Sequence, residues 1–428
     1  MREGKAIIET MAADFADLLR HNRNYRYTWL GQVVSETGDY FNNIAVFALV
    51  MAAGGSGLVV SGVMLSRAIP AVLAGPVAGV ILDRFDRRRI MLASDLIRAA
   101  VALAFVVTVR HPAAWLLYAL SALLMFASPF FTSGRAAILP VIASPAELHT
   151  ANSLTQTTQW ATLTAGTMLA GFAVARLGFT GAFVINSLSF VFSAFAVWRL
   201  DVPEGFVPLG RHAATGIVRP WHEYVEGLAY IRATPLVFWI GMISVGWAMG
   251  GGAAQILFAL FGEQVFGRGA AGIGTIWGFA GVGLLIGGWI GHRAGRRGSF
   301  AGYKRTISIA YLSHGLAYVA FSQMRSYGLA LVCICLSRVG MAVSSVLNYS
   351  QLLRHTPDHF RGRVFSTMES LRWSVMIVSM AAAGVASQYF SARTIGTVAG
   401  ILGSLTAAAW AWADGAGRIP EPGKDGSS

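Results

Sequence analysis

A few charged side chains interrupt long apolar segments of this sequence, and their depth limits the chemistry they can do. Asp39 lies about 11 residues into the segment 28–51, which is roughly 17 Å along a helix and near the middle of a bilayer. An ionised acid at that depth costs on the order of 2.5–3.5 kcal/mol, a cost that protonation removes. We therefore predict that Asp39, with Asn43 beside it, binds a proton or a cationic group. The alternative is a structural ion pair between Asp39 and Arg67 or Arg98.

Arginines in such segments keep their charge, so each needs an acid, carbonyl groups or an anionic ligand. Asp95 and Arg98 stand three residues apart on one predicted helix, which favours a structural pair. Glu369 and Arg372 have the same spacing but lie closer to the end of their segment, so a gate and a structural pair both remain open. Arg338 has no acid at this spacing and lies near the middle of its segment, which favours a functional role.

Uncharged polar and aromatic residues in the same segments are candidates for the wall of a cavity that accepts a bulky amphiphilic compound. These candidates are Phe126, Phe130, Gln156, Gln159, Trp247, Gln255 and Asn348. Each has a structural alternative, because amides often join neighbouring helices and aromatic rings often fill a core.

The elements that must position these residues are long apolar helices. The chain has 428 residues, of which 55% are hydrophobic and only 12% charged, and its mean hydropathy is +0.57. This composition excludes an ordinary soluble enzyme, a disordered chain and a secreted disulfide scaffold. Twelve segments are long enough to span a bilayer. They are 28–51, 58–82, 90–109, 113–134, 151–175, 179–199, 236–261, 270–291, 306–324, 327–350, 363–389 and 394–413.

The order of these segments predicts an all-α membrane protein of twelve transmembrane helices in two six-helix halves. The halves cover 28–199 and 236–413, joined by a polar connector, 200–235, and flanked by the segments 1–27 and 414–428. Prolines interrupt the connector, and the residues 221–233 within it predict a short amphipathic helix.

The basic residues are distributed unevenly between the two sides of this predicted topology. One side, which includes both termini, carries 24 of the 33 lysines and arginines, the other carries 5, and 4 lie inside the segments. Cytoplasmic loops are enriched in basic residues, so we expect both termini in the cytoplasm. The net charge of +13 then follows from contact with a lipid bilayer, and it gives no reason to expect a nucleic-acid partner.

A motif at the end of the second segment recurs in the other half. Its residues are Gly79, Asp83, Arg84, Arg87 and Arg88, and Gly288 and Arg293 stand 209 positions after Gly79 and Arg84. The motif resembles the first-loop signature of the major facilitator superfamily, G-x-x-x-D-R/K-x-G-R/K-R/K, although Asp86 replaces a glycine and His292 replaces the acid of the second copy. The resemblance implies two repeated six-helix halves and a conformational latch formed by these residues. The alternative is a loop that is merely basic.

Shorter motifs resemble the drug and siderophore exporter branch of that superfamily, which includes enterobactin exporters and macrolide efflux pumps. They are Leu30-Gly31-Gln32 with Gly38-Asp39, Ala151-Asn152-Ser153-Leu154, and Arg361-Gly362-Arg363-Val364. The resemblance implies a secondary transporter of the bacterial inner membrane that exports a drug-like compound or a siderophore by proton-coupled alternating access. The usual antiporter motif of the fifth segment is absent. Uptake of a nutrient, transport of a lysophospholipid and a non-transporting receptor remain alternatives.

Motifs for other chemistry are absent from the sequence. It has no phosphate-binding G-x-x-x-x-G-K-[ST] loop, no H-E-x-x-H or G-x-S-x-G motif and no CxxC metal pair. We therefore expect no enzymatic activity, no cofactor and no metal. The expected partners are a small-molecule substrate, protons and the bilayer, with the protein as a monomer.

Overall fold

The computed structural model describes residues 13–111, 113–201, 220–297 and 299–421. Within these residues the regular secondary structure is entirely helical. The helices of the first half of the chain are α2 (Arg23–Ala52), α3 (Gly57–Arg84), α4 (Arg87–Arg110), α5 (Ala114–Ile142) and α6 (Leu148–Trp198). Those of the second half are α7 (Pro220–Ala233), α8 (Pro235–Leu260), the π-helical turn η1 (Phe261–Val265), α9 (Gly269–Arg297), α10 (Phe300–Gln323), α11 (Tyr327–His355), α12 (Asp358–Ala386) and α13 (Ala392–Gly415).

All twelve predicted segments fall on these helices, with α6 carrying two of them. Eight of the described helices are long and apolar enough to cross a membrane. The helices α2, α10 and α12 fall outside that group, and two of them carry the charged residues that the sequence singled out: Asp39 on α2, and Glu369 and Arg372 on α12. The protein is therefore an all-helical, multi-pass membrane protein.

The longest helix, α6, is two helical segments joined at Gly178. This glycine has φ 71° and ψ 179°, a conformation that is open only to glycine, so it ends the first segment and begins the second. The break coincides with the predicted boundary between the segments 151–175 and 179–199. The short helix predicted at 221–233 is confirmed as α7.

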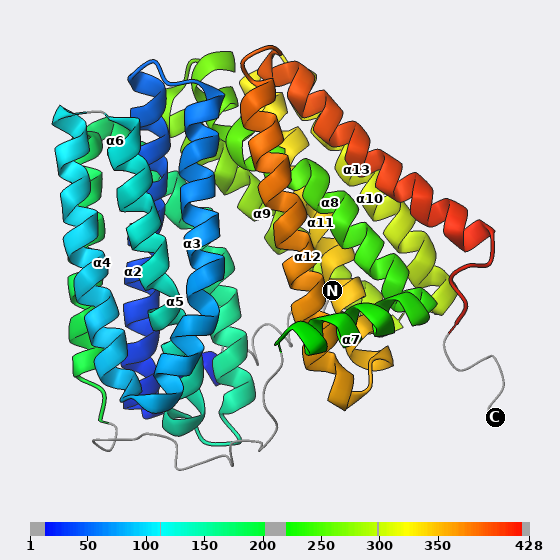
Figure 1. The fold of residues 1–428 in the computed structure, drawn as a ribbon, viewed down its shortest axis with the longest axis horizontal. Coiled ribbons are helices and arrows are strands. Elements are labelled where there is room, and N and C mark those ends of the chain that lie inside the picture. Colours follow the sequence, from blue (N-terminus) through cyan, green and yellow to red (C-terminus); the bar gives the residue numbers. More distant parts are fainter. Residues whose placement is uncertain (1–12, 112, 202–219, 298, 422–428) are drawn as a thin grey trace. The chain divides into compact units, whose positions relative to one another are not determined.

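The described residues separate into two compact units. In the first unit, which holds α2, α4, α5, α6 and most of α3, α2 packs along α6, and α4 packs against α5 and α6 (Figure 1). Its buried core includes Tyr25, Met91, Phe131, Ile138 and Leu200. This packing brings side chains from α2, α5 and α6 together inside one unit.

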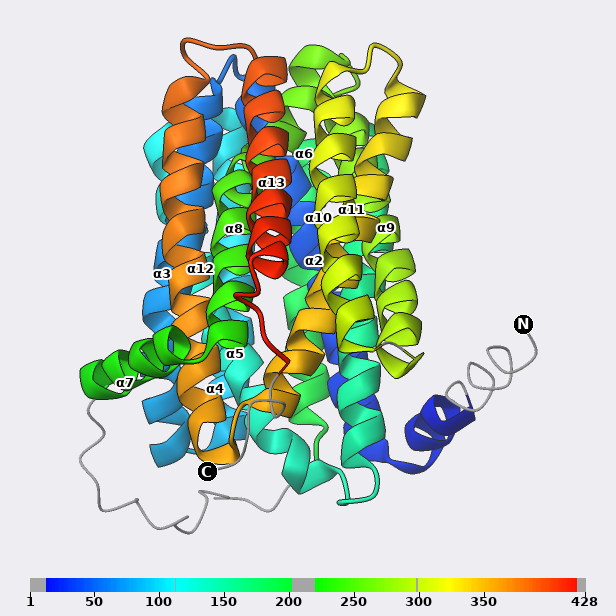
Figure 2. The ribbon, with the colours of Figure 1, turned by 90° about the vertical axis from the view of Figure 1, so that its right-hand side faces the viewer.

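The second unit is built from α7, α8, α10, α11, α12, α13 and most of α9. Here α10 lies beside α11 and α13, α8 packs against α12 and α13, and α7 contacts α12; Figure 2 shows α10 and α13 side by side. Glycines allow close approach in this unit. A Cβ atom at Gly283 would stand 2.2 Å from the Cys335 carbonyl oxygen, so α9 and α11 are in backbone contact at this point.

Candidate functional site

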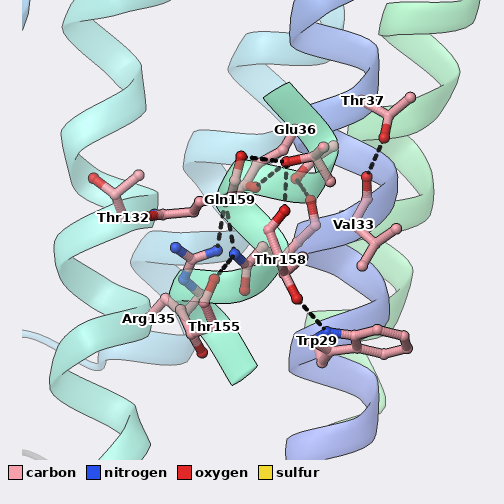
Figure 3. A network of polar contacts seen from close by, with 12 residues as sticks. Trp29, Val33, Glu36, Thr37, Thr132, Arg135, Thr155, Thr158 and Gln159 are labelled. Carbon is pink, nitrogen blue, oxygen red and sulfur yellow. Dashed lines mark hydrogen bonds and ion pairs between the residues drawn. The ribbon is translucent and has the colours of Figure 1, made fainter. Parts of the chain in front are cut away.

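A polar network in the first unit is centred on Glu36 of α2 (Figure 3). One carboxylate oxygen accepts hydrogen bonds from Gln32 Nε2 at 2.9 Å and from an Arg135 guanidinium nitrogen at 3.3 Å. The other accepts from the Thr162 hydroxyl at 2.9 Å. Because Arg135 is on α5 and Thr162 on α6, this single carboxylate connects three helices.

The sequence analysis did not identify Glu36 or Arg135. Arg135 was assigned to a loop after the segment 113–134, but α5 continues to Ile142 and leaves the side chain only 9% exposed. A signal was present, since Glu36 is a second acid one turn before Asp39 on the same apolar segment. The network continues through Trp29, whose indole N–H donates to the Thr158 hydroxyl at 2.8 Å.

Asp39 lies one turn further along α2, in a different environment. Its Oδ1 atom is buried and accepts no hydrogen bond from any described residue, and the positive charges of Arg98 and Arg67 both act on the carboxylate. Arg67 of α3 is buried and donates to Asn42 Oδ1 at 3.4 Å. The Oδ1 atom of Asn43 is also buried without a described partner. Asp39 and Asn43 thus form a polar patch with unused acceptor capacity.

The predicted pair between Asp95 and Arg98 is confirmed. The two side chains form a buried ion pair and hydrogen bond on α4. The Arg98 guanidinium also lies 4.5 Å from the Phe131 ring centre and 4.3 Å from that of Phe190. Arg98 therefore has a complete set of local partners, which makes it a structural residue and leaves Arg67 as the nearer candidate partner for Asp39.

The second unit contains a pocket of about 220 Å³ that brings together four of the predicted residues, Trp247, Asn348, Glu369 and Arg372. It is lined by side chains of α8, α10, α11 and α12. The aromatic lining residues are Trp247, Tyr311, Tyr349 and Phe365. An apolar wall with a few polar groups is the usual construction of a site for a small organic molecule.

Glu369 and Arg372 supply the charges of this pocket. They form an ion pair with two hydrogen bonds, one of them 3.0 Å long, and Glu369 also accepts from the Trp373 indole N–H at 2.8 Å. The Arg372 guanidinium lies 5.7 Å from the Trp247 ring centre. Both side chains remain partly exposed, so a charged group of a bound molecule can reach either of them.

Asn348 has a structural role beside its place in the pocket. Its Oδ1 accepts from the Tyr303 hydroxyl at 2.8 Å, and its Nδ2 donates to the Ser344 hydroxyl at 3.3 Å. The predicted alternative of an amide that joins two helices therefore applies, because Tyr303 is on α10 and Asn348 on α11.

The remaining cavity candidates lie apart from this pocket. Phe126 and Phe130 contact each other on α5, with ring centres 6.0 Å apart, and Phe126 is exposed. Gln156 is exposed on α6, and Gln159 borders the Glu36 network, its carbonyl oxygen accepting from Thr162 at 3.1 Å. Gln255 is partly buried on α8. The structure therefore does not gather them into one site.

The motif between α3 and α4 contains basic residues that bind backbone carbonyls within the first unit. Arg87 donates to Ala137 O of α5 at 2.7 Å, and Arg88 donates to the Val197 and Trp198 carbonyl oxygens at the end of α6. Asp86, which replaces the usual glycine, caps α4 by accepting from the Arg89 backbone N–H at 3.1 Å.

Asp83 and Arg84, the acid and base of the predicted latch, are exposed at the end of α3. Asp83 lies 3.9 Å from Arg87, and its side chain is 78% exposed. Gly79 has open space around its Cα. In the second copy, Gly288 is buried and Arg293 stacks on Trp289 at 3.9 Å from the ring centre. Asp83 is thus free to take a partner on another helix.

Comparison with known proteins assigns the family. The sequence profile of the Major Facilitator Superfamily matches residues 28–380. The chain belongs to this superfamily. Its members are transporters and not enzymes, and within the described residues no group of three or more potential metal ligands occurs.

Several relatives cover most of the chain. The MFS-type transporter YfiS of Bacillus subtilis is 26% identical over 90% of this chain and 92% of its own. Macrolide efflux protein A of Streptococcus pyogenes is 23% identical over 85% and 88%. A crystal structure of a bacterial homologue of the iron transporter ferroportin, in an inward-facing state, has a TM-score of 0.68, 20% identity and coverage of 91% and 98%. The last similarity shows the shared transporter fold.

Proposed function

We propose that this protein exports a drug-like organic compound across the bacterial inner membrane. The observation that carries the proposal is the pocket of the second unit, where aromatic rings surround the Glu369–Arg372 pair. Aromatic walls suit an amphiphilic compound, and an acid beside a base recognises its charged group. Similarity to a macrolide efflux protein supports the outward direction.

Proton entry drives this export, with Asp39 as the carboxylate that binds and releases the proton. Protonation of Asp39 leaves no described hydrogen-bond donor without its acceptor, because Oδ1 accepts none. Protonation of Glu36 would weaken hydrogen bonds from Gln32, Arg135 and Thr162. Asp39 is therefore the acid that can change charge at lower structural cost.

The cycle is alternating access between two six-helix halves, with twelve membrane spans, both termini in the cytoplasm and a monomeric protein. The exposed Asp83 and Arg84, with the neighbouring motif residues, stabilise one facing state. The basic loops of the cytoplasmic side support this orientation.

Drug accumulation in a bacterial strain that lacks its own efflux pumps tests the proposed direction and cargo. Cells that produce the protein should accumulate less erythromycin than cells that carry an empty plasmid, and a protonophore should abolish the difference. Higher accumulation in the producing cells would contradict export.

A matched pair of variants ties the effect to the pocket. Tyr349→Ala removes a ring from the pocket wall and should restore accumulation. Tyr389→Ala removes an equally exposed ring that does not line the pocket, and it should leave export intact. Equal effects of the two substitutions would contradict the assignment of the pocket.

A further inference from the structure

Arg338 of α11 is a buried cation without a matching anion in the described part of the chain. Its side chain is 8% exposed, and the described residues place no carboxylate within ion-pair distance of it. Its guanidinium contacts the Met341 sulfur at 3.3 Å and lies 5.3 Å from the Phe258 ring centre. A thioether is a weak acceptor, so these contacts leave most of the five N–H groups of the guanidinium unused.

The side chains around Arg338 add hydrogen-bond donors. Arg338, Tyr318, Trp247 and His314 line one small void, and the Tyr318 hydroxyl and the Trp247 indole N–H are both buried with no partner among the described residues. His314 cannot neutralise Arg338, since an imidazole is neutral or positive, and its Nδ1 is already bonded to Ser337. A buried polar group without a partner is unusual and indicates a missing ligand.

The rest of the void's lining supplies no side-chain acceptor. It consists of small residues of α8 and α13: Gly250, Gly251, Ala254, Ala399 and Gly403. The void has a volume of about 10 Å³, which is about the volume needed for a single atom-sized occupant. Convergent donors, a fixed positive charge and this size together define the chemistry of the occupant.

We propose that this void binds one monovalent anion of about the size of chloride. The anion accepts from Arg338 of α11, the Tyr318 hydroxyl of α10 and the Trp247 indole N–H of α8, and it neutralises the arginine. It thereby joins three helices of the second unit. A water molecule would accept from two of these donors but would leave the charge of Arg338 uncompensated.

Thermal unfolding of the purified full-length protein in detergent tests this site. Chloride replaces gluconate, a much larger anion, at constant ionic strength. A ligand that binds only the folded protein raises its Tm, so the Tm should rise with chloride and then saturate. Arg338→Met keeps a long side chain without the charge, and it should unfold at a Tm that does not depend on chloride.

A tyrosine pair provides the matched control and does not depend on whether Arg338→Met folds. Tyr318→Phe removes one donor from the void and should raise the chloride concentration at half-saturation roughly tenfold. Tyr303→Phe removes a buried hydroxyl of the same helix that bonds Asn348 instead, and should leave the half-saturation point unchanged. A wild-type Tm that is indifferent to chloride, or equal half-saturation points for both tyrosine variants, would overturn the proposal.

Discussion

At the scale of single residues, the carboxylate of Glu36 holds three helices of the first unit together. It is only 21% exposed and binds Arg135, whose side chain is 9% exposed. Removing one member of a buried pair leaves the other charge without compensation, which costs more than the pair itself contributes. Glu36 should therefore be more important for stability than its absence from any recognised motif suggests.

We expect Glu36→Gln to lower the Tm of the detergent-solubilised protein, with a loss of about 1–3 kcal/mol in the free energy of unfolding. Combination with Arg135→Met should recover most of the loss, because it removes the stranded charge. Glu226→Gln is the matched control: Glu226 pairs with Arg363 at 2.9 Å, but both side chains are more than a third exposed, and exposed pairs contribute little. Equal losses for both glutamates would contradict this account.

Residue pairs were predictable where they are local in the sequence. Asp95 with Arg98, and Glu369 with Arg372, follow from a spacing of three residues on a helix, and both pairs occur. The Glu36–Arg135 contact spans 99 residues and depends on how α2 packs against α5, which periodicity does not encode. The contacts of Arg338 depend equally on tertiary packing, although its lack of a local acid was visible in the sequence.

At the scale of elements, the break at Gly178 allows α6 to supply two membrane segments. An L-residue at φ 71° and ψ 179° is strained whatever space surrounds it. The backbone at this position, and not packing, should therefore decide the effect of a substitution.

We expect Gly178→Ala to destabilise the protein by about 1–3 kcal/mol, because the conformation is one that alanine rarely adopts. Gly328→Ala, at the start of α11, is the control: it has open space around it and no positive φ, so its Tm should match or slightly exceed that of the wild type. Melting curves of the two variants decide the question, and an unchanged Tm for Gly178→Ala would count against the strained break.

The α3–α4 motif gives a second element-scale prediction. Asp83→Asn removes a charge from an exposed side chain, so the Tm should not change while transport into everted vesicles becomes slower. Asp86→Asn keeps the helix cap, since asparagine caps as well as aspartate, and should transport at the wild-type rate. A wild-type rate for Asp83→Asn would show that the loop is only a basic cytoplasmic loop.

Hydropathy predicted the helices well because burial in lipid requires long apolar segments, and all twelve segments fall on helices. It could not show that α5 continues through Arg135 to Ile142, since a charged residue looks like the end of a span. Nor could it show which aromatic residues share a pocket. Trp247 and Asn348 reach one pocket, whereas Phe126 and Phe130 contact each other elsewhere.

At the scale of the whole molecule, the distribution of basic residues predicts the orientation in the membrane. Single cysteines at Gly55 and Gly362, in a background with Cys333→Ala and Cys335→Ala, should differ in their reaction with a membrane-impermeant thiol reagent. On intact spheroplasts the reagent should label position 55 and not position 362. Gly362 tolerates a side chain, because no atom lies within 4 Å of the position its Cβ would take. The opposite labelling pattern would reverse the orientation.

The central claim is that proton entry through Asp39 drives export, and proteoliposomes test it most directly. Asp39→Asn mimics the protonated state, so uptake of radiolabelled erythromycin driven by a proton gradient should collapse while exchange without a gradient persists. The variant's Tm should stay close to that of the wild type. A structural ion pair predicts otherwise: a lower Tm, equal loss of driven transport and exchange, and recovery of both when Arg67→Gln is added. That second result would contradict the coupling role of Asp39.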